Sequence, residues 1–175
     1  VLEHLNDPAA VIRKCTDLLA DDGTLVISIP NISYAYLIAE LINGEFEYGP
    51  EGLLDRTHLR FFTRRSFERL IASEQWFVSA CEPIQQPWFE TEFRLKFDDL
   101  PPNVGAFLLA QPDAGVYQWV FVARKTPTPY LELSNPEPAR HFSPATFLAQ
   151  IYITTNQGLQ AHRPINALGN IGELH

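Results

Sequence analysis

The segment Asp7–Ile29 has the pattern of a capped helix, a tight turn and a buried strand, and it limits the fold more than any other part of the chain. Asp7 is a favourable N-cap, and the proline after it suits the first turn of a helix. An Asp-Gly pair is expected to end this helix, because glycine tolerates a positive φ. Thr24–Ile29 (TLVISI) is β-rich and apolar almost throughout, as in a strand covered on both faces. The segment therefore predicts half of a parallel α/β crossover.

Further elements follow in an order that suits an α/β fold. Residues 34–42 predict an apolar helix closed by Asn43-Gly44, and Thr63 can cap another helix. Phe77–Cys81 and Val116–Ala123 predict strands. The first predicted helix carries one apolar stripe at helical spacing, made of Val11, Ile12, Cys15, Leu18 and Leu19.

The connection 85–115 is too long for a hairpin turn. Phe89, Phe93 and Phe97 lie four residues apart, which predicts a short helix that either packs on the domain or forms the wall of a substrate pocket. From Thr126 the sequence becomes rich in proline, so we predict that residues 1–125 form one domain and 126–175 a linker. Phe147–Thr154 predicts one strand, which must pair with the main domain or begin a truncated β-rich domain, since a lone strand cannot bury itself.

Charge and cysteine content restrict the partners and the compartment. The net charge is -8 and no basic run is present, which argues against nucleic-acid binding and leaves small molecules and protein partners open. Cys15 and Cys81 fall in apolar periodic segments, which favours buried free thiols and a cytoplasmic location. No apolar run approaches the roughly 18 residues of a membrane span.

The opening Val1–Leu5 is interpreted as an apolar strand end that delivers the pair Glu3-His4 to an active-site edge. The carboxyl ends of parallel strands are where such folds bind ligands. A Glu with two His is a divalent-metal set, and His58 on the loop before Thr63 is the candidate third member. The abrupt start at Val1 and the absence of methionine indicate a fragment.

These elements and motifs resemble the C-terminal part of a class I S-adenosylmethionine-dependent methyltransferase. The resemblance rests on Val1–Asn31 and on Gly52–Leu70, and with the strand near 116–124 it covers about the first 125 residues. It implies a Rossmann-like sheet of parallel strands with a closing antiparallel strand, in which Val1–Leu5 ends the fourth strand. The family's Gly-rich cofactor loop would lie upstream, so Leu2 and Glu3 are the expected cofactor contacts, and this chain alone is expected to transfer little or no methyl group.

The resemblance also supports the metal hypothesis. Some members of the family carry a Glu-x-x-Glu-His motif and a later His-x-x-x-x-Thr-Arg motif. Glu3-His4 matches the end of the first, and His58 to Arg64 matches the second. Glu3, His4 and His58 are therefore candidate catalytic residues and metal ligands, although a polar contact with substrate or a purely structural role stays open.

Four further residues are candidates for substrate binding, each with a structural alternative. Arg56 and Arg60 flank His58, and an Asp-Arg pair in a loop is often structural. Asn31 can line the pocket or satisfy the turn after its strand. Tyr34 can cap a substrate or pack in the core.

Methyl transfer from S-adenosylmethionine to an oxygen of a small molecule or glycan is the function that the sequence favours. The alternative is a non-catalytic interaction or scaffold module that completes its sheet with a partner, or by self-association through an open sheet edge.

Overall fold

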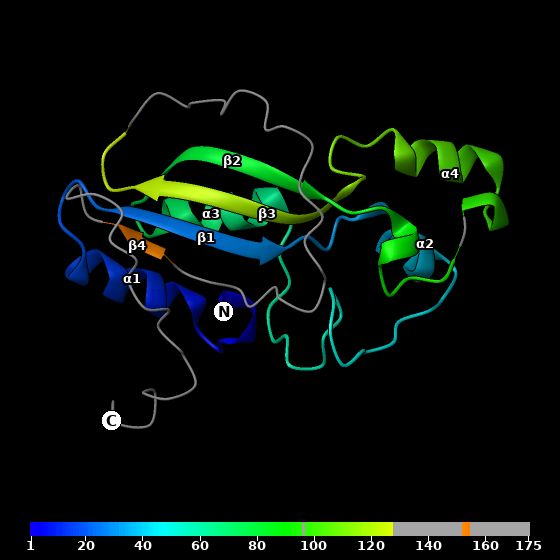
Figure 1. Ribbon diagram of the computed structural model, residues 1–175, viewed down its shortest axis with the longest axis horizontal. Helices are drawn as coiled ribbons and strands as arrows, with labels where there is room; N and C mark the ends of the chain where they lie inside the picture. Colours follow the sequence, from blue (N-terminus) through cyan, green and yellow to red (C-terminus); the bar gives the residue numbers. More distant parts are fainter. Residues whose placement is uncertain (96, 128–151, 155–175) are drawn as a thin grey trace.

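The computed structural model describes residues 1–95, 97–127 and 152–154 (Figure 1). Its strands form one sheet in the order β2-β3-β1-β4, with β1 at Thr24–Pro30, β2 at Phe77–Gln85, β3 at Val116–Arg124 and β4 at Tyr152–Thr154. The α-helices are α1 (Pro8–Leu18), α2 (Ala35–Ile42), α3 (Arg64–Ser73) and α4 (Pro102–Leu109). The predicted α/β class is confirmed.

The sheet pairs its described strands in antiparallel fashion. β3 lies between β2 and β1, and Ile27 of β1 lies opposite Phe121 of β3. The antiparallel pairing of β2 with β3 agrees with the predicted closing pair. The parallel Rossmann-type sheet is not confirmed, because each pairing among these four strands is antiparallel.

The prediction of a strand end at Val1–Leu5 is wrong. Leu2–His4 forms a single 3₁₀ turn, in which the amides of His4 and Leu5 bond to the carbonyls of Val1 and Leu2. A strand needs a hydrogen-bonded neighbour, and none of the described strands pairs with these residues. The turn satisfies the backbone locally while Leu2 enters the core at 1% exposure.

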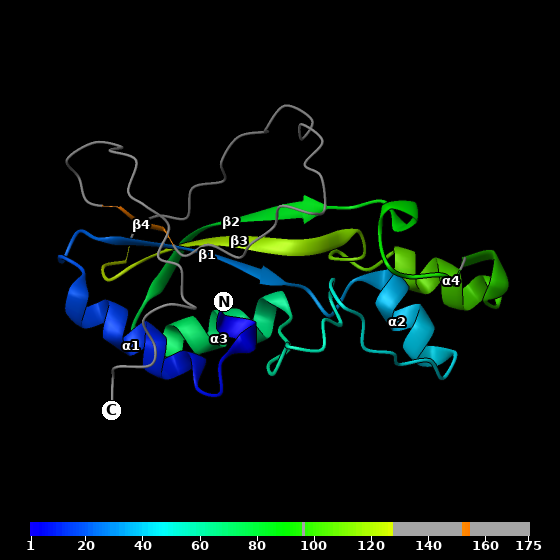
Figure 2. The ribbon, with the colours of Figure 1, turned by 60° about the horizontal axis from the view of Figure 1, so that its bottom comes forward.

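Helices α1 and α3 cover the same face of the sheet (Figure 2). Asp7 caps α1 by accepting a hydrogen bond from the amide of Ala10, and Thr63 and Ser66 form a capping box at α3. Both helix starts therefore follow the prediction. Two details differ, since α1 ends at Leu18, before the Asp-Gly pair, and the Leu18 side chain is 78% exposed.

The main core lies between this helical layer and the sheet. The sequence predicted that β1 is covered on both faces. Buried and half-buried residues alternate along the strand instead, so one face is covered more completely than the other. The indole of Trp76 donates to the hydroxyl of Thr16 at 2.8 Å and ties α1 to the turn before β2. Cys15 and Cys81 are buried free thiols, as predicted. The larger core residues include Ile12, Leu25, Ile29, Phe67, Ile71, Trp76 and Phe121.

A second group of elements lies beyond the carboxyl end of β1 (Figure 1). This cap consists of α2, residues 86–95 and 97–101, and α4. The predicted helix through Phe89, Phe93 and Phe97 is wrong, because 3₁₀ turns form instead at Trp88–Glu90 and Phe97–Asp99. Phe93 is buried whereas Phe89 is 67% exposed, so the three rings do not share one face.

Described residues of the tail form one strand of the sheet. β4 pairs with Thr24–Val26 along the outer edge of β1, so the end of the predicted strand 147–154 pairs with the main domain. Residues 147–151 and the proline-rich 128–146 lie outside the described residues, and the division at residue 125 stays a prediction. No helix in the described part of the chain is long and apolar enough to cross a membrane.

Candidate functional site

The loop before α3 is bonded to the first turn of the chain. The carbonyl oxygen of Glu3 accepts hydrogen bonds from the amides of Leu59 at 2.7 Å and Arg60 at 2.9 Å. These two bonds hold His58 against the Glu3-His4 pair although 54 residues of chain separate the two histidines.

Glu3, His4 and His58 converge as predicted. One ligand atom from each lies within 4.8 Å of the other two. Glu3 Oε1 is 3.6 Å from His4 Nε2 and 4.0 Å from His58 Nε2, and the two imidazole rings are 4.7 Å apart at an angle of 65°. The Glu3 and His58 side chains are buried, whereas that of His4 is 39% exposed. His4 is therefore the side of the cluster that a ligand reaches first.

Hydrogen bonds on the far side of each ring orient both histidines. His58 donates through Nδ1 to the carbonyl oxygen of Leu53 at 3.0 Å. His4 Nδ1 lies 2.9 Å from the Thr57 hydroxyl, which itself donates to Asp55 and so accepts from His4. A neutral imidazole that donates through Nδ1 presents the lone pair of Nε2. In this tautomer each histidine keeps the lone pair of Nε2, the ring nitrogen that lies 3.6 Å (His4) or 4.0 Å (His58) from Glu3 Oε1, available for a cation.

Asp55 anchors this arrangement. Its carboxylate accepts from the Thr57 hydroxyl at 2.6 Å and from the Thr57 amide at 2.7 Å. Burial raises the pKa of Asp55, but the two Thr57 hydrogen bonds and the nearby His58 and His4 outweigh it, so the pKa lies below its ordinary value. Asp55 therefore stays ionised and holds the hydroxyl that orients His4.

A second carboxylate supports His58 from the cap. Glu92 accepts from the amide of Leu53 at 2.7 Å and from the hydroxyl of Tyr117 at 2.8 Å. Burial, and then the neighbouring Glu92, raise the pKa of Tyr117. Gly52 has a φ of 92°, and a Cβ there would clash with the Glu92 carboxylate. Glu92 thus fixes the backbone of Leu53, whose carbonyl orients His58.

The donor set fits a divalent cation. Two imidazole nitrogens and a carboxylate match the ligands of catalytic zinc sites, and the outward hydrogen bonds of the rings match their usual supports. Ligands held at about 2.1 Å with tetrahedral angles lie roughly 3.4 Å apart, so the separations of 3.6 and 4.0 Å need only a small contraction.

Family comparison matches the same part of the chain. Residues 1–76 match the model of a family described as a methyltransferase domain. This segment is therefore similar to a class I methyltransferase domain. Domains of this kind generally use S-adenosylmethionine. No curated protein matches the chain.

Two predicted substrate residues of the methyltransferase-like domain are engaged within the protein. The Asn31 side chain is fully buried, donates to the Val116 carbonyl at 2.7 Å and accepts from Ser33, so it satisfies the turn after β1. Tyr34 is also fully buried and donates to the Gln86 carbonyl at 2.8 Å. The polar groups of both side chains are therefore hydrogen-bonded within the protein, as in the structural alternative for each residue.

The remaining predicted residues lie around the loop. Arg56 is exposed and bonds to the Gly49 carbonyl at 3.3 Å, and Arg60 is exposed and bonds to the Asn6 carbonyl at 2.6 Å. Both guanidinium groups therefore brace the loop that carries His58. Leu2, a predicted cofactor contact, is buried in the core, so only its backbone can meet a ligand.

Thr57 and Glu92 are the supporting residues that sequence reasoning missed. Asp55 and Thr57 have the spacing of an Asp turn, which was a local signal. Glu92 reaches Leu53 across 39 residues, and nothing in the sequence marks that contact.

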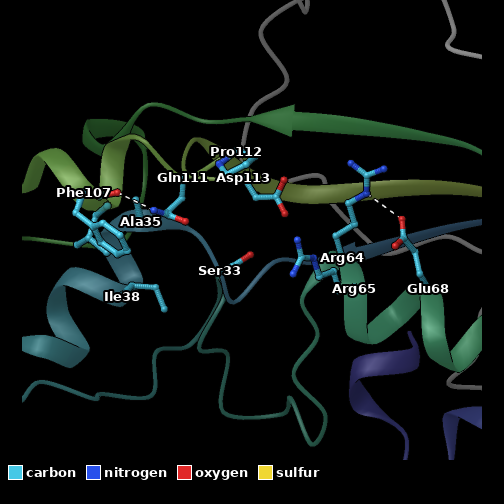
Figure 3. Close-up of a pocket in the computed structure, with 11 residues that line it drawn as sticks. Ser33, Ala35, Ile38, Arg64, Arg65, Glu68, Phe107, Gln111, Pro112 and Asp113 are labelled. Carbon is cyan, nitrogen blue, oxygen red and sulfur yellow. Dashed lines mark hydrogen bonds and ion pairs between the residues drawn. The ribbon is translucent and has the colours of Figure 1, made fainter.

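An open cleft lies away from this cluster. It has a volume of about 610 Å³ and lies between α2, the start of α3 and the end of α4 (Figure 3). None of Glu3, His4 and His58 lines it. The protein therefore has two separate features that need explanation, a Glu-His-His cluster and an open cleft beside the cap.

Proposed function

We propose that this protein transfers a methyl group from S-adenosylmethionine to a hydroxyl oxygen of a small molecule or glycan, and that Glu3, His4 and His58 bind a divalent cation beside that hydroxyl. The convergence of three ligand atoms within 4.8 Å, with both imidazoles turned by outward hydrogen bonds, carries the proposal. The methyltransferase match supports the reaction class.

The chemistry requires the acceptor hydroxyl to lose its proton as its oxygen bonds to the methyl carbon. S-adenosylmethionine supplies the methyl group and keeps the electrons of the broken carbon–sulfur bond on its sulfur. His4 is the partly exposed member of the cluster, so an incoming hydroxyl would meet the cation on that side, and the proton that the hydroxyl loses would pass to solvent.

A divalent cation held by Glu3, His4 and His58 would lower the pKa of a hydroxyl that contacts it. The buried His58 and Glu3 supply the fixed part of this site, and Asp55 with Thr57 keeps the third ligand in place. The residues around the cluster thus act by orientation, which is where proteins contribute most to group transfer.

Cofactor affinity of this chain alone is proposed to be weak. A Gly-rich turn at a helix N-terminus normally holds such a cofactor. In the described part of the chain, β1 leads into α2 through residues 31–34, which contain no glycine. Calorimetric titration with S-adenosylhomocysteine should therefore show weak binding or none, and tight binding would contradict this part of the proposal.

A radiolabel assay tests the reaction itself. The protein is incubated with methyl-labelled S-adenosylmethionine and a panel of phenols, alcohols and sugars, with Mn²⁺ or Zn²⁺ and then with a chelator. The proposal predicts slow transfer to a hydroxyl compound, reduced by chelation and by Glu3→Gln, while Glu47→Gln, which changes an exposed carboxylate outside the cluster and the cleft, serves as a control. A rate of methyl transfer that neither the chelator nor Glu3→Gln reduces would show that the cluster takes no part in the reaction.

A second candidate function rests on the outer edge of β1. β4 covers Thr24–Val26, whereas Ile27–Pro30 have no strand partner on that edge among the described residues. An exposed edge can accept another strand, which is the geometry of an interaction module that completes its sheet with a partner. Sedimentation velocity that gives a monomer at all concentrations would count against self-association through this edge.

A further inference from the structure

The open cleft beside the cap is lined by charges of both signs. Arg64 and Arg65 come from the first turn of α3, Glu68 from its second turn, and Asp113 from the segment between α4 and β3 (Figure 3). Two cations and two carboxylates cancel, so the cleft has no net charge that would select an ionic ligand.

Several of these polar groups keep hydrogen-bonding capacity. Arg65 is exposed, and its guanidinium makes no hydrogen bond or ion pair with the described residues, so it can donate to a ligand. The Asp113 carboxylate accepts no hydrogen bond from the described residues. Ser33 donates to Asn31 but retains lone pairs, and Gln111 uses its amide nitrogen on Phe107 but not its oxygen. Donors and acceptors therefore face one space from several sides.

One wall of the cleft is apolar. Phe107 of α4 is 65% exposed, and it lies beside Ile38 of α2 on the side away from the arginines. An aromatic ring attracts weakly positive hydrogens to its face, because the face carries the negative part of its quadrupole. Phe107 can therefore seat the C–H face of a saturated ring while the polar wall bonds to the substituents.

Arg64 is the fixed part of the polar wall. It pairs with Glu68 at 2.9 Å and stacks over the Trp119 ring at 5.2 Å. A guanidinium held in this way is pre-organised, so it loses little entropy when it bonds to a ligand.

We propose that this cleft binds a neutral, polyhydroxylated ring such as a sugar. Hydroxyl groups donate and accept at once, so they match a wall that offers both functions and no net charge. A volume of about 610 Å³ falls within the roughly 300–1,000 Å³ that is typical of small-molecule sites. Binding at this cleft does not depend on methyl transfer, but the identification of the bound ring as the methyl acceptor rests on the proposed function.

Saturation-transfer NMR on the whole chain tests this site. The probes are the methyl glycosides of glucose, galactose and mannose, with benzoate as an anionic ring and cyclohexanol as an apolar ring. The proposal predicts that at least one glycoside binds, and that it binds more tightly than benzoate and cyclohexanol. Absence of glycoside binding, or a preference for either comparison ring, would overturn the proposal.

Variants locate the binding and have matched controls. Phe107→Ala and Asp113→Asn should each weaken glycoside binding by about tenfold, which corresponds to about 1.4 kcal/mol. Phe89→Ala and Asp21→Asn change residues of the same type that are exposed outside the cleft, and they should leave binding unchanged. Equal binding by all four variants would place the glycoside elsewhere and refute the site.

Glycoside binding and methyl labelling are measured separately, so the cleft proposal and the proposed reaction can fail independently. If the glycoside binds at the cleft but receives no methyl label, the binding site stands and its role as acceptor site is refuted. If the protein methylates another compound and binds no glycoside, the cleft proposal fails while the reaction stands.

Discussion

His58 donates its Nδ1 proton to the carbonyl oxygen of Leu53 at 3.0 Å, and this bond turns Nε2 toward the Glu3 carboxylate. The bond belongs to the folded loop whether or not a ligand is present. Asparagine can place its amide nitrogen near the position of Nδ1 but has no atom at Nε2. It therefore separates the structural role of His58 from its ligand role.

His58→Ala is expected to lower the free energy of unfolding by about 2–3 kcal/mol, because it leaves a buried carbonyl unpaired and a cavity behind. His58→Asn should cost about 1 kcal/mol or less, since the bond to Leu53 is retained. Urea unfolding followed by circular dichroism measures both. Equal losses in the two variants would show that the bond to Leu53 contributes nothing.

Gly52→Ala is expected to destabilise the protein by about 2 kcal/mol or more, since a residue with a Cβ is strained at positive φ and would meet the Glu92 carboxylate. The double variant Gly52→Ala with Glu92→Ala should lose less than the sum of the two single variants, because the clash disappears. A double-mutant cycle from urea unfolding measures this coupling. Additive losses of unfolding free energy would mean that the Glu92 carboxylate does not clash with the Cβ of alanine at position 52.

Asp55→Asn should lower stability in a pH-dependent way. The folded-state pKa of Asp55 lies below its ordinary value, so its stabilising contribution is present above the unfolded pKa and is lost as the pH falls through the folded pKa. The difference between native protein and variant should be about 1 kcal/mol at pH 7 and should shrink below about pH 4. A difference that stays constant from pH 7 to pH 3 would contradict the role of its charge.

The two thiols should be protected in the folded protein. Burial raises the pKa of Cys15, and burial with the nearby Glu68 raises that of Cys81 to about 12, despite an opposing effect of Arg64. A rise from 9.0 to about 12 lowers the thiolate fraction at pH 8 by about a thousandfold. Labelling with a disulfide reagent should be slow in buffer and reach two thiols in urea. Rapid labelling of either cysteine in buffer would contradict the burial.

Local signals predicted the parts of this fold that depend on local chemistry. The caps at Asp7 and Thr63 are set within four residues of chain, so both helix starts follow from the sequence. The four-residue spacing of Phe89, Phe93 and Phe97 misled because the segment forms 3₁₀ turns at Trp88–Glu90 and Phe97–Asp99. The turn at Leu2–His4 could not be told from a strand, because strand formation depends on neighbours.

In the candidate site, too, the sequence predicted some features and missed those that depend on distant contacts. The family motifs brought Glu3, His4 and His58 together correctly, although their roles stay predictions. The support from Glu92 and Tyr117 was missed, because it depends on contacts across 25 and 39 residues that carry no local pattern. Asn31 and Tyr34 lie near the edge of the sheet that the sequence predicted, but their polar atoms form hydrogen bonds within the protein.

Titration of the protein with Co²⁺ tests the central claim most directly, because Co²⁺ held by two imidazoles and a carboxylate absorbs visible light more strongly than Co²⁺ in water. We expect one Co²⁺ per chain in the native protein, and at least about tenfold weaker binding in Glu3→Gln and in His58→Asn. Glu68→Gln, which changes an acidic residue outside the cluster, should bind as the native protein does. A native protein that gives no visible band, or one that Glu3→Gln and His58→Asn leave unchanged, would contradict the proposal that Glu3, His4 and His58 form a divalent-cation site.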